Sequence, residues 1–413
     1  MTSVAKRLFA TVVLLAGVAL PAMAEDTIKI GLIDPLSGTF SQQGDATLKQ
    51  FAYLFNLVNA DGGALGKKFE LVPFDDKLQP AEALIALKSV TDQNIRFVMS
   101  CTGSNIGAAL VDGVRKQNAR NPDSRVLYMN CGALASDLTN DKCDFWHFRF
   151  DANTKMRAET LVRGLPKTLK TVYLLDQDYL FGQTLHAETK EFLAKLRPDI
   201  KIVGDEFIPL GKVKDFSSYI SKIQGSTAEA LITGNWGPDL NLLLKAAVDA
   251  GLKIQFYTYL SHVVGAPTSI GAMGENRLHT VVEFHPNVPV EQNSAAGEKF
   301  VTDWRKDHDF DLFQMNNYIM LKMLAAAINK AKSTDPLKVA LALEGATMKG
   351  ILGHEYTMRA ADHQLLEPLY VSEFTKGVKY DSEKTGFGWK TDAVVEGGDL
   401  AQPTSCKMIR PKS

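Results

Sequence analysis

Runs of apolar residues alternate with helical patterns along most of the chain, and this alternation limits the fold more than any other feature of the sequence. Strand-like runs occur at 28–33, 69–74, 97–101, 126–130, 171–175, 200–206, 230–233, 256–259 and 281–284. Helical patterns occur between them at 45–60, 80–92, 104–117, 156–165, 183–196, 216–224 and 239–250. Several strand-like runs are apolar throughout, as expected of parallel strands that are buried on both faces. The sequence therefore predicts an α/β protein in which mainly parallel sheets are flanked by helices.

The pattern changes after about residue 290. Helices are predicted in succession at 293–307, 314–332 and 336–343, and short strands follow near 356–358 and 369–374. The Gly-rich tail that comes next is predicted to be a loop. Because a chain of 413 residues is too long for one hydrophobic core, we expect two domains. No low-complexity linker separates them, so we expect the chain to pass between the domains more than once.

The N-terminal segment has the parts of a cleavable export signal. Lys6 and Arg7 form a short positive region, 8–20 is an apolar run, and Ala22-Met23-Ala24 offers a cleavage site. An uncleaved membrane anchor is the weaker interpretation, because no charged stop-transfer flank follows the apolar run. No other apolar stretch is long enough to span a membrane. We therefore predict that 1–24 is a signal peptide and that the exported protein is soluble.

Charge and motif content exclude several classes of function. Lys and Arg number 46 against 47 Asp and Glu, and no basic cluster with interleaved aromatic residues occurs. Neither nucleic acid nor an anionic membrane surface is therefore an expected partner. The sequence contains no G-x-S-x-G, H-E-x-x-H, Walker lysine or G-x-G-x-x-G motif, and its histidines lack metal-ligand spacing. We expect no enzyme activity, catalytic residue, cofactor or metal. The Asp75-Asp76 pair is interpreted as a solvated turn that caps the next helix.

The chain has four cysteines, Cys101, Cys131, Cys143 and Cys406, and their number favours disulfides in an exported protein. Four cysteines allow three full pairings, and the sequence alone does not choose among them. The absence of a C-x-x-C motif argues against a redox or zinc-knuckle site.

Polar and small residues follow three of the predicted strands, where ligands bind in parallel α/β sheets. The segment 101–105 reads Cys-Thr-Gly-Ser-Asn and begins a helix, so its backbone N–H groups and hydroxyls suit a carboxylate. The segment 130–133 ends the next strand, and 234–239 ends a strand in the second half. In this last segment Asp239 could face an ammonium group and Trp236 could contact an apolar side chain. Each feature alone is also compatible with helix capping or packing, but together they favour a cleft.

Short motifs then give the chain a resemblance to a known family. They are Ile28-Lys29-Ile30-Gly31, Pro35-Leu36-Ser37-Gly38, Gln43-Gly44, Asn59-Ala60-Asp61-Gly62-Gly63, Gly132-Ala133, Leu138-Thr139, Phe148-Arg149, Asp178-Tyr179-Leu180-Phe181-Gly182, Asp215-Phe216-Ser217 and Ala250-Gly251-Leu252. In their order and spacing, the chain resembles the type I periplasmic solute-binding proteins of ABC importers, in the leucine/isoleucine/valine-binding class. The resemblance covers essentially the whole mature chain.

This resemblance implies two α/β lobes, three hinge crossings and a ligand trapped when the lobes close. The expected lobes are 25–145 with 284–355, and 146–283 with 356–413. By similarity, Thr102 and the backbone at 103–104 take an amino-acid carboxylate, while the Ala133 carbonyl and Asp239 take its ammonium group. Phe181 is expected to close the cleft. The complete set of expected ligand-binding residues is Gln43, Cys101, Thr102, Gly103, Ser104, Ala133, Leu134, Tyr179, Phe181, Trp236, Asp239 and Tyr259.

The resemblance also implies a disulfide between Cys143 and Cys406 that fastens the C-terminal tail, with Cys131–Cys143 as a local alternative. In the expected pairing Cys101 and Cys131 are free and buried. Three positions depart from the family pattern, namely Gly103, Leu134 and Phe181, and all three make the site more apolar.

We therefore expect a periplasmic component of an ABC importer that captures an aliphatic or branched-chain amino acid. Its expected partners are this small molecule and an inner-membrane permease, and the protein is expected to be a monomer. An aromatic carboxylate or amide is the alternative ligand, favoured by Trp236, Phe181, Leu134 and Tyr259. An exported sensory receptor module that presents the ligand to a membrane kinase is an alternative role.

Overall fold

A five-stranded sheet forms the centre of the first lobe, and each of its strands runs parallel to its neighbours. The strand order is β2-β1-β3-β4-β5. The strands are β1 Ile28–Asp34, β2 Phe69–Asp75, β3 Phe97–Ser100, β4 Leu127–Asn130 and β5 His147–Arg149. The helices that share its hydrophobic core are α1 Ser41–Ala60, α2 Pro80–Asp92, α3 Ser104–Arg120, α10 Ala295–Arg305, α11 Met315–Ala331 and α12 Pro336–Leu343. The strands β3 and β4 are buried along their whole length, which explains their unbroken apolar sequences.

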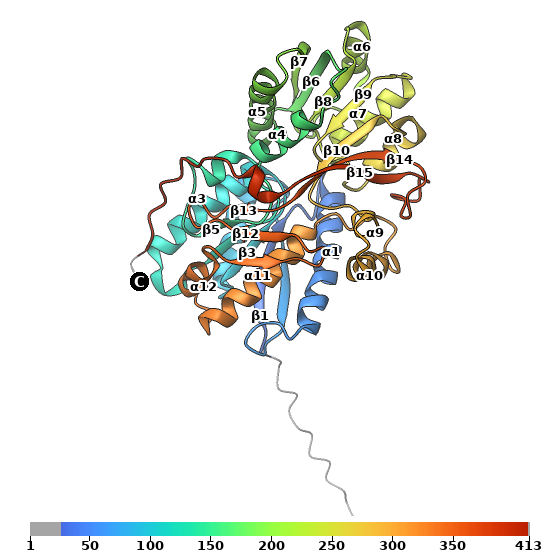
Figure 1. Cartoon of the computed structure of the whole chain (residues 1–413). Helices are drawn as coiled ribbons and strands as arrows, with labels where there is room; N and C mark the ends of the chain where they lie inside the picture. The colour runs from blue at the N-terminus through green and yellow to red at the C-terminus, as the bar shows by residue number, and fades with distance from the viewer. Residues whose placement is uncertain (1–25, 412–413) are drawn as a thin grey trace, which may run out of the picture.

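A seven-stranded sheet forms the second lobe, in the order β15-β14-β10-β9-β8-β6-β7. Its strands are β6 Thr171–Gln177, β7 Lys201–Ile208, β8 Ala230–Thr233, β9 Gln255–Thr258, β10 Leu278–Val282, β14 Leu369–Thr375 and β15 Gly388–Val395. All neighbours are parallel except β14, which is antiparallel to both β10 and β15. The helices of this part of the chain are α4 Thr154–Gly164, α5 Leu180–Leu196, α6 Ser217–Gly225, α7 Gly237–Asp249 and α8 Ala266–Ile270. Figure 1 shows the second lobe, largely green and yellow, above the blue, cyan and orange first lobe.

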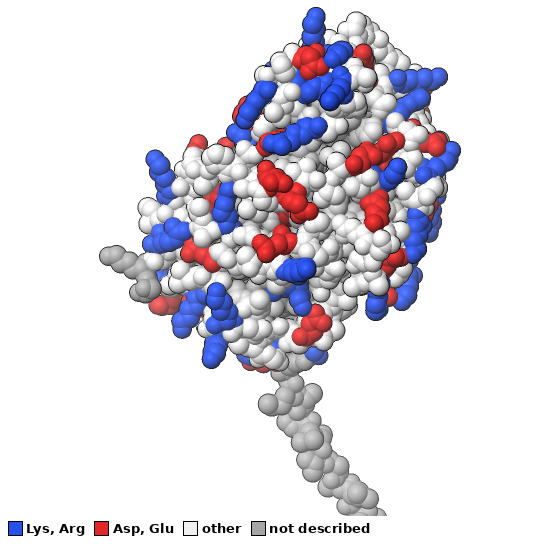
Figure 2. Space-filling model, viewed as in Figure 1, with Lys and Arg blue, Asp and Glu red and all other residues white. Residues whose placement is uncertain are grey.

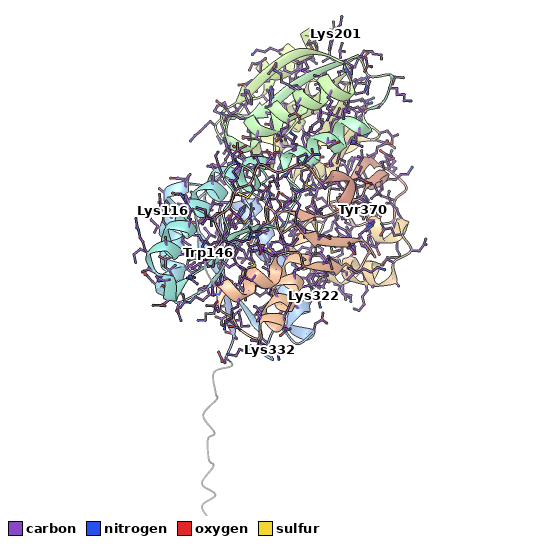
Figure 3. All side chains as sticks on the ribbon, turned by 60° about the vertical axis from the view of Figure 1, so that its left-hand side comes forward. Lys116, Trp146, Lys201, Lys322, Lys332 and Tyr370 are labelled. Carbon is purple, nitrogen blue, oxygen red and sulfur yellow. A yellow bond between two sulfur atoms is a disulfide. The ribbon has the colours of Figure 1, made fainter. Side chains whose placement is uncertain are left out.

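The computed structural model describes residues 26–411, so the predicted signal peptide at 1–24 lies outside the described residues. Among residues 26–411 no helix combines the length and the apolar character that a membrane span requires. Lys201 and Lys332 mark opposite ends of the two-lobe molecule (Figure 3). Acidic and basic side chains are interspersed over the face shown in Figure 2.

Three short segments carry the chain between the two sheets. They are 150–153 between β5 and α4, 283–287 between β10 and α9 (Val288–Glu291), and 367–368 between β13 (Leu365–Leu366) and β14. The predicted boundary at 145 precedes β5, which pairs with β4, and the predicted boundary at 355 falls within β12 (Glu355–Met358). Sheet pairing therefore favours later crossings, while the division into 25–145 with 284–355 and 146–283 with 356–413 stays a prediction.

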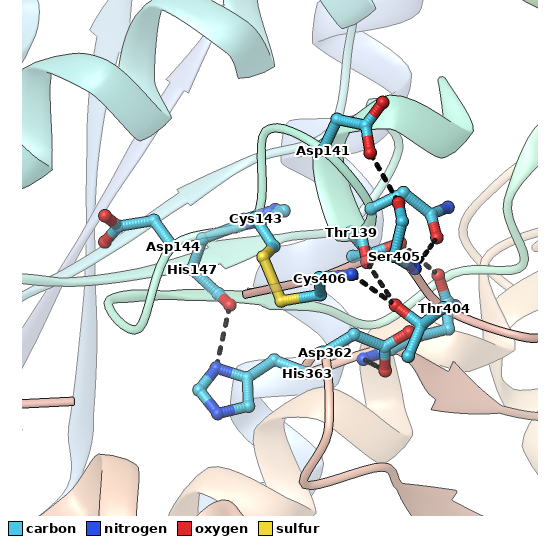
Figure 4. The surroundings of a disulfide bond; sticks show 12 residues. Thr139, Asp141, Cys143, Asp144, His147, Asp362, His363, Thr404, Ser405 and Cys406 are labelled. Carbon is cyan, nitrogen blue, oxygen red and sulfur yellow. Dashed lines mark hydrogen bonds between the residues drawn. A yellow bond between two sulfur atoms is a disulfide. The ribbon is translucent and has the colours of Figure 1, made fainter. Parts of the chain in front are cut away.

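A small antiparallel sheet and the C-terminal tail return to the first lobe. The small sheet contains β11 (Thr347–Lys349), β12 and β13, and its apolar side chains join the first lobe's core. The tail is fastened by the predicted disulfide between Cys143 and Cys406 (Figure 4). Beside it the Thr404 hydroxyl donates to the Thr139 carbonyl at 3.3 Å. The tail therefore lies along the loop before β5.

Three expectations from the sequence were wrong. The predicted loop after residue 374 contains β15, which forms the edge of the second sheet and pairs with β14. Cys101 and Cys131 are not free, because they form a second disulfide. Asp76 is not in a solvated turn: it is fully buried, although its neighbour Asp75 accepts the turn N–H groups of Leu36 and Lys77. The mainly parallel two-lobe α/β architecture is as predicted.

Candidate ligand-binding cleft

A cavity lies between the lobes and encloses about 620 Å³ of unfilled space, including open solvent at its mouth. The first lobe contributes Gln43, Thr47, Cys101, Thr102, Gly103, Gly132, Leu134, Phe313 and Gln314. The second lobe and the crossings contribute Asp151, Arg157, Tyr179, Phe181, Trp236, Leu260, His262, Val263 and Glu283. The cavity is therefore built from strand ends of both sheets, as expected for an interlobe site.

One wall of the cavity is a helix N-terminus that no side chain caps. Gly103 precedes α3 with a φ of 83°, and Ser104 begins the helix. Thr102 and Ser104 are buried, and no side chain caps the N-terminal N–H groups of α3. Because N–H groups at a helix start carry partial positive charge and need acceptors, this wall suits a carboxylate.

Acidic side chains at the crossings between the lobes line another part of the cavity. Arg157 on α4 donates from Nη2 to Asp151 of the first crossing at 2.7 Å and to Glu283 of the second at 2.8 Å. Its other N–H groups donate to the carbonyls of Ala152, Val281 and Tyr259, the last at 3.5 Å. The guanidinium is thus fully engaged, and no described residue donates to the second oxygen of either carboxylate. This part of the cavity suits a cation.

Glu367 lies at the third crossing and adds another buried carboxyl group. Neither of its oxygens has a hydrogen-bond partner among the described residues, and burial raises its pKa well above the usual range. Burial also raises the pKa of Asp151, although Arg157 opposes the shift. Asp151 and Glu283 therefore share one guanidinium, while Glu367 lies unpaired among the described residues at the third crossing. A cationic ligand would favour the ionised form of Asp151.

Aromatic side chains form the wall contributed by the second lobe. Trp236 donates from Nε1 to the Tyr179 hydroxyl at 2.8 Å, and the Tyr179 and Phe181 ring centroids are 6.0 Å apart. Across the mouth, the ring of Phe40 in the first lobe lies 4.7 Å from that of Trp236. Gln43 also donates to the carbonyl of Val264 at 3.2 Å. The lobes therefore touch at this edge, which is the arrangement of a closed cleft.

His262 adds no positive charge to the cavity near neutral pH. Burial lowers its pKa to about 4, so the ring is neutral. Asp151, Arg157 and Glu283 are the charged residues of the lining, and the other lining residues are apolar or uncharged. The cavity thus combines the N–H groups at the start of α3, the carboxylates paired with Arg157 and an apolar wall between them.

Most residues predicted from the sequence line this cavity. Those that do are Gln43, Cys101, Thr102, Gly103, Leu134, Tyr179, Phe181 and Trp236. The cavity lining does not include Ser104, Ala133, Asp239 or Tyr259. The Ser104 hydroxyl accepts the Ala135 N–H at 3.1 Å, and the Tyr259 hydroxyl is buried against Thr189 at 2.8 Å.

The two groups expected to hold an ammonium ion accept hydrogen bonds from protein donors and lie outside the cavity lining. The Ala133 carbonyl accepts from Asn130 at 2.9 Å and from Arg149 at 3.3 Å. The Asp239 carboxylate accepts from the Gln177 side chain and the Gly211 N–H, both at 2.8 Å. Both donors to Asp239 bind the same oxygen, Oδ2. Burial raises the pKa of Asp239, although the hydrogen bonds from Gly211 and Gln177 act to lower it. The geometry therefore favours Asp151 and Glu283 as cation partners in their place.

Sequence reasoning missed the charged residues at the crossings. Asp151 follows a strand of only three residues, and Arg157 lies in a helical pattern. Glu283 falls inside the apolar run predicted at 281–284, and a charge within such a run was the one signal that could have identified it. The other missed lining residues are Thr47, Gly132, Leu260, His262, Val263, Phe313 and Gln314.

Comparison with known proteins agrees with this architecture. A model of the family described as periplasmic binding protein matches residues 27–379. The chain belongs to this family. It is 30% identical to the Leu/Ile/Val-binding protein homolog 4 of Brucella abortus (strain 2308) over 423 residues, which cover 97% of this chain and 99% of the relative.

One further relative is similar in sequence, and one solved structure is similar in fold. The leucine-, isoleucine-, valine-, threonine- and alanine-binding protein of Pseudomonas aeruginosa is 27% identical, over 84% of this chain and 90% of its own. The closed crystal structure of the protein of that name from Brucella ovis superposes with a TM-score of 0.82 at 29% identity, covering 94% of this chain and 100% of the other. As a periplasmic binding protein, the chain has the two-lobe fold of these relatives throughout its described length.

Proposed function

We propose that this protein is the periplasmic substrate-binding component of an ABC importer and captures an aliphatic or branched-chain amino acid. One observation carries the proposal: a single interlobe cavity combines the uncapped start of α3 with the acid-rich cluster around Arg157. A zwitterion satisfies both ends at once. The names of the Brucella and Pseudomonas relatives support the same ligand class.

In the proposed pose, the ligand carboxylate accepts N–H groups at Gly103 and the start of α3. The ammonium group binds the free oxygens of Asp151 and Glu283, and the side chain packs against Tyr179, Phe181 and Trp236. The ion pairs with Arg157 fix both carboxylates in place before the ligand arrives. Such preorganisation reduces the cost of binding. The role predicted for Asp239 is untested, and this pose does not use it.

The proposed protein carries out no chemistry on its ligand. It works as an exported monomer that releases the solute to an inner-membrane permease. An aromatic carboxylate is the second candidate ligand, because aromatic rings line the second lobe's side of the cavity. That candidate has no ammonium group for the carboxylates at the crossings, which would then have Arg157 as their one cation among the described residues.

Calorimetry with four related compounds tests the ligand class. Leucine is compared with 4-methylpentanoate, which lacks the ammonium group, with 3-methylbutylamine, which lacks the carboxylate, and with benzoate. We expect leucine to bind and each truncated compound to lose more than about tenfold in affinity. Preferential binding of benzoate or 4-methylpentanoate would replace the amino-acid assignment with the aromatic or aliphatic acid.

Mass spectrometry of the solute that co-purifies with the protein is an independent test. Recovery of an aliphatic amino acid supports the proposal. Loss of uptake of that amino acid when the protein is deleted, with the permease intact, would favour transport over sensing. The molar mass of the ligand-bound protein in solution, measured by light scattering, tests whether the protein is a monomer.

A further inference from the structure

A disulfide joins Cys101 and Cys131 immediately behind the loop that forms the carboxylate-binding end of the cavity. Cys101 follows β3 and Cys131 follows β4, which are adjacent strands of the first sheet, and their Cα atoms are 4.4 Å apart. Cys101 lines the cavity and is 7% exposed, whereas Cys131 is fully buried. The bond therefore connects the two strand ends that support the ligand site.

Other contacts show how little freedom this loop has. The Cys101 N–H donates to Asp34 at 3.0 Å, and the Cys131 N–H donates to the Ser100 carbonyl at 3.0 Å. A Cβ atom on Gly132 would lie 2.0 Å from the Cys101 carbonyl oxygen, so the two strand ends approach as closely as glycine allows. The residues next to Cys101 are Thr102 and Gly103, which line the cavity.

We propose that the Cys101–Cys131 disulfide is a positioning element of the ligand site: it holds 101–103 in the geometry that binds a carboxylate, and bound ligand shields it from thiols. The proposal deepens the function proposed above and rests on it. Preorganised N–H groups bind an anion without an ordering cost, so removing the covalent link weakens binding. Cys101 lines the cavity, so a bound ligand hinders the approach of a thiol to this end of the disulfide.

The second disulfide provides a matched control. Cys143 and Cys406 lie outside the cavity lining and connect the tail to the loop before β5. Each double variant, Cys101→Ala with Cys131→Ala and Cys143→Ala with Cys406→Ala, removes one covalent link. Only the first pair supports the ligand site, so the two variants separate positioning from general stabilisation.

Leucine affinity is measured by calorimetry for both double variants and the unchanged protein. We expect the Cys101/Cys131 variant to bind leucine at least about tenfold more weakly and the control variant to stay within about twofold. Amide hydrogen exchange of the ligand-free proteins should show faster exchange at 102–106 in the first variant alone. Equal affinity and unchanged exchange at 102–106 would overturn the proposal.

Shielding is measured on the unchanged protein, which avoids any folding defect of the variants. A thiolate of dithiothreitol attacks the Cys101 sulfur, the Cys101–Cys131 bond breaks, and the Cys131 thiolate leaves and takes up a proton. The second thiol of the reagent then displaces Cys101, giving two protein thiols and the cyclic disulfide of the reagent. Alkylation and peptide mapping report the rate for each bond.

Saturating leucine should slow reduction of Cys101–Cys131 at least about fivefold and leave Cys143–Cys406 unaffected. Equal rates with and without bound leucine would contradict the shielding. If the unchanged protein binds no leucine, the proposed ligand fails. Hydrogen exchange at 102–106 in ligand-free protein then still decides whether the disulfide positions the loop.

Discussion

Arg157 and Glu283 form an ion pair of 2.8 Å that joins α4 to the second crossing between the lobes. The same guanidinium nitrogen binds Asp151 of the first crossing at 2.7 Å. All three side chains are buried. One cation thus joins two of the three segments that carry the chain between the lobes, and both of its carboxylate partners line the cavity. In the proposed pose, the residues that bind the ligand are therefore also residues of the crossings.

Replacing Glu283 by glutamine should weaken leucine binding by about 2–5 kcal/mol, because a desolvated partner of the ammonium group loses its charge. The amide oxygen can still accept from Arg157, so the hinge keeps a hydrogen bond. Calorimetry of Glu283→Gln measures the loss. Asp239→Asn is the matched control, since Asp239 is buried outside the cavity, and its affinity should change less than about twofold. The reverse order of effects would restore Asp239 as the ammonium partner.

Leucine affinity should rise as the pH is raised from about 5 and then level off. Burial raises the pKa of Asp151 in the ligand-free protein, so this carboxyl group holds a proton where an ordinary aspartate is ionised. A bound ammonium ion lowers that pKa, and binding therefore releases a proton in the interval between the two values. Calorimetry in buffers of different ionisation enthalpy counts the released protons. An affinity that falls with increasing pH would argue against ammonium binding at this cluster.

Asp76→Asn should make the protein more stable relative to the unchanged chain as the pH rises. Burial raises the pKa of Asp76 to about 7, while the unfolded chain ionises near its ordinary value. The folded protein holds the extra proton between these values, so stability falls as pH rises through this interval, and the penalty is complete above about pH 7.

Asparagine removes this penalty and can still accept the Leu78 N–H, which lies 2.8 Å from Asp76. Denaturant unfolding should show a relative gain on the order of 3–4 kcal/mol between about pH 4 and pH 8. Asp123→Asn, at an exposed position, is the control and should show little change. If the variant were instead more stable than the unchanged chain at low pH and not at high pH, the raised pKa of Asp76 would be contradicted.

Phe40→Ala should weaken ligand binding without removing a residue that lines the cavity. The Phe40 ring packs against Trp236 from the other lobe and is nearly buried, so its loss favours separation of the lobes. A smaller closed population lowers the apparent affinity in proportion, here by about three- to tenfold. Small-angle scattering of the ligand-free variant should show a larger radius of gyration. Unchanged scattering together with unchanged affinity would show that this contact does not control closure.

The strands were predictable where burial on both faces produces an unbroken apolar sequence. The strands β3 and β8 are buried on both faces, and their apolar runs identified them. In contrast, β15 is largely exposed beyond Trp389, and its polar residues resembled a loop. The three-residue strand β5 is too short to produce a pattern.

The cavity lining was predictable where it follows a strand end. Thr102 and Tyr179 line the cavity because parallel strands place their carboxyl ends at one edge. Asp151, Arg157 and Glu283 were missed because crossings far apart in sequence meet only when the lobes assemble. The hydrogen bond from Arg149 to the Ala133 carbonyl was likewise not visible in the sequence, since Arg149 comes from another strand.

The Cys143–Cys406 disulfide imposes an order on assembly. Its partners are 263 residues apart, whereas Cys101 and Cys131 are 30 residues apart and follow adjacent strands of one sheet. The longer loop costs more entropy to close, so Cys101 and Cys131 meet more readily than Cys143 and Cys406. Formation of the Cys101–Cys131 bond removes the competitors and leaves Cys143 for the tail. We therefore expect a chain that keeps only one of Cys101 and Cys131 to pair Cys143 wrongly more often than the unchanged chain.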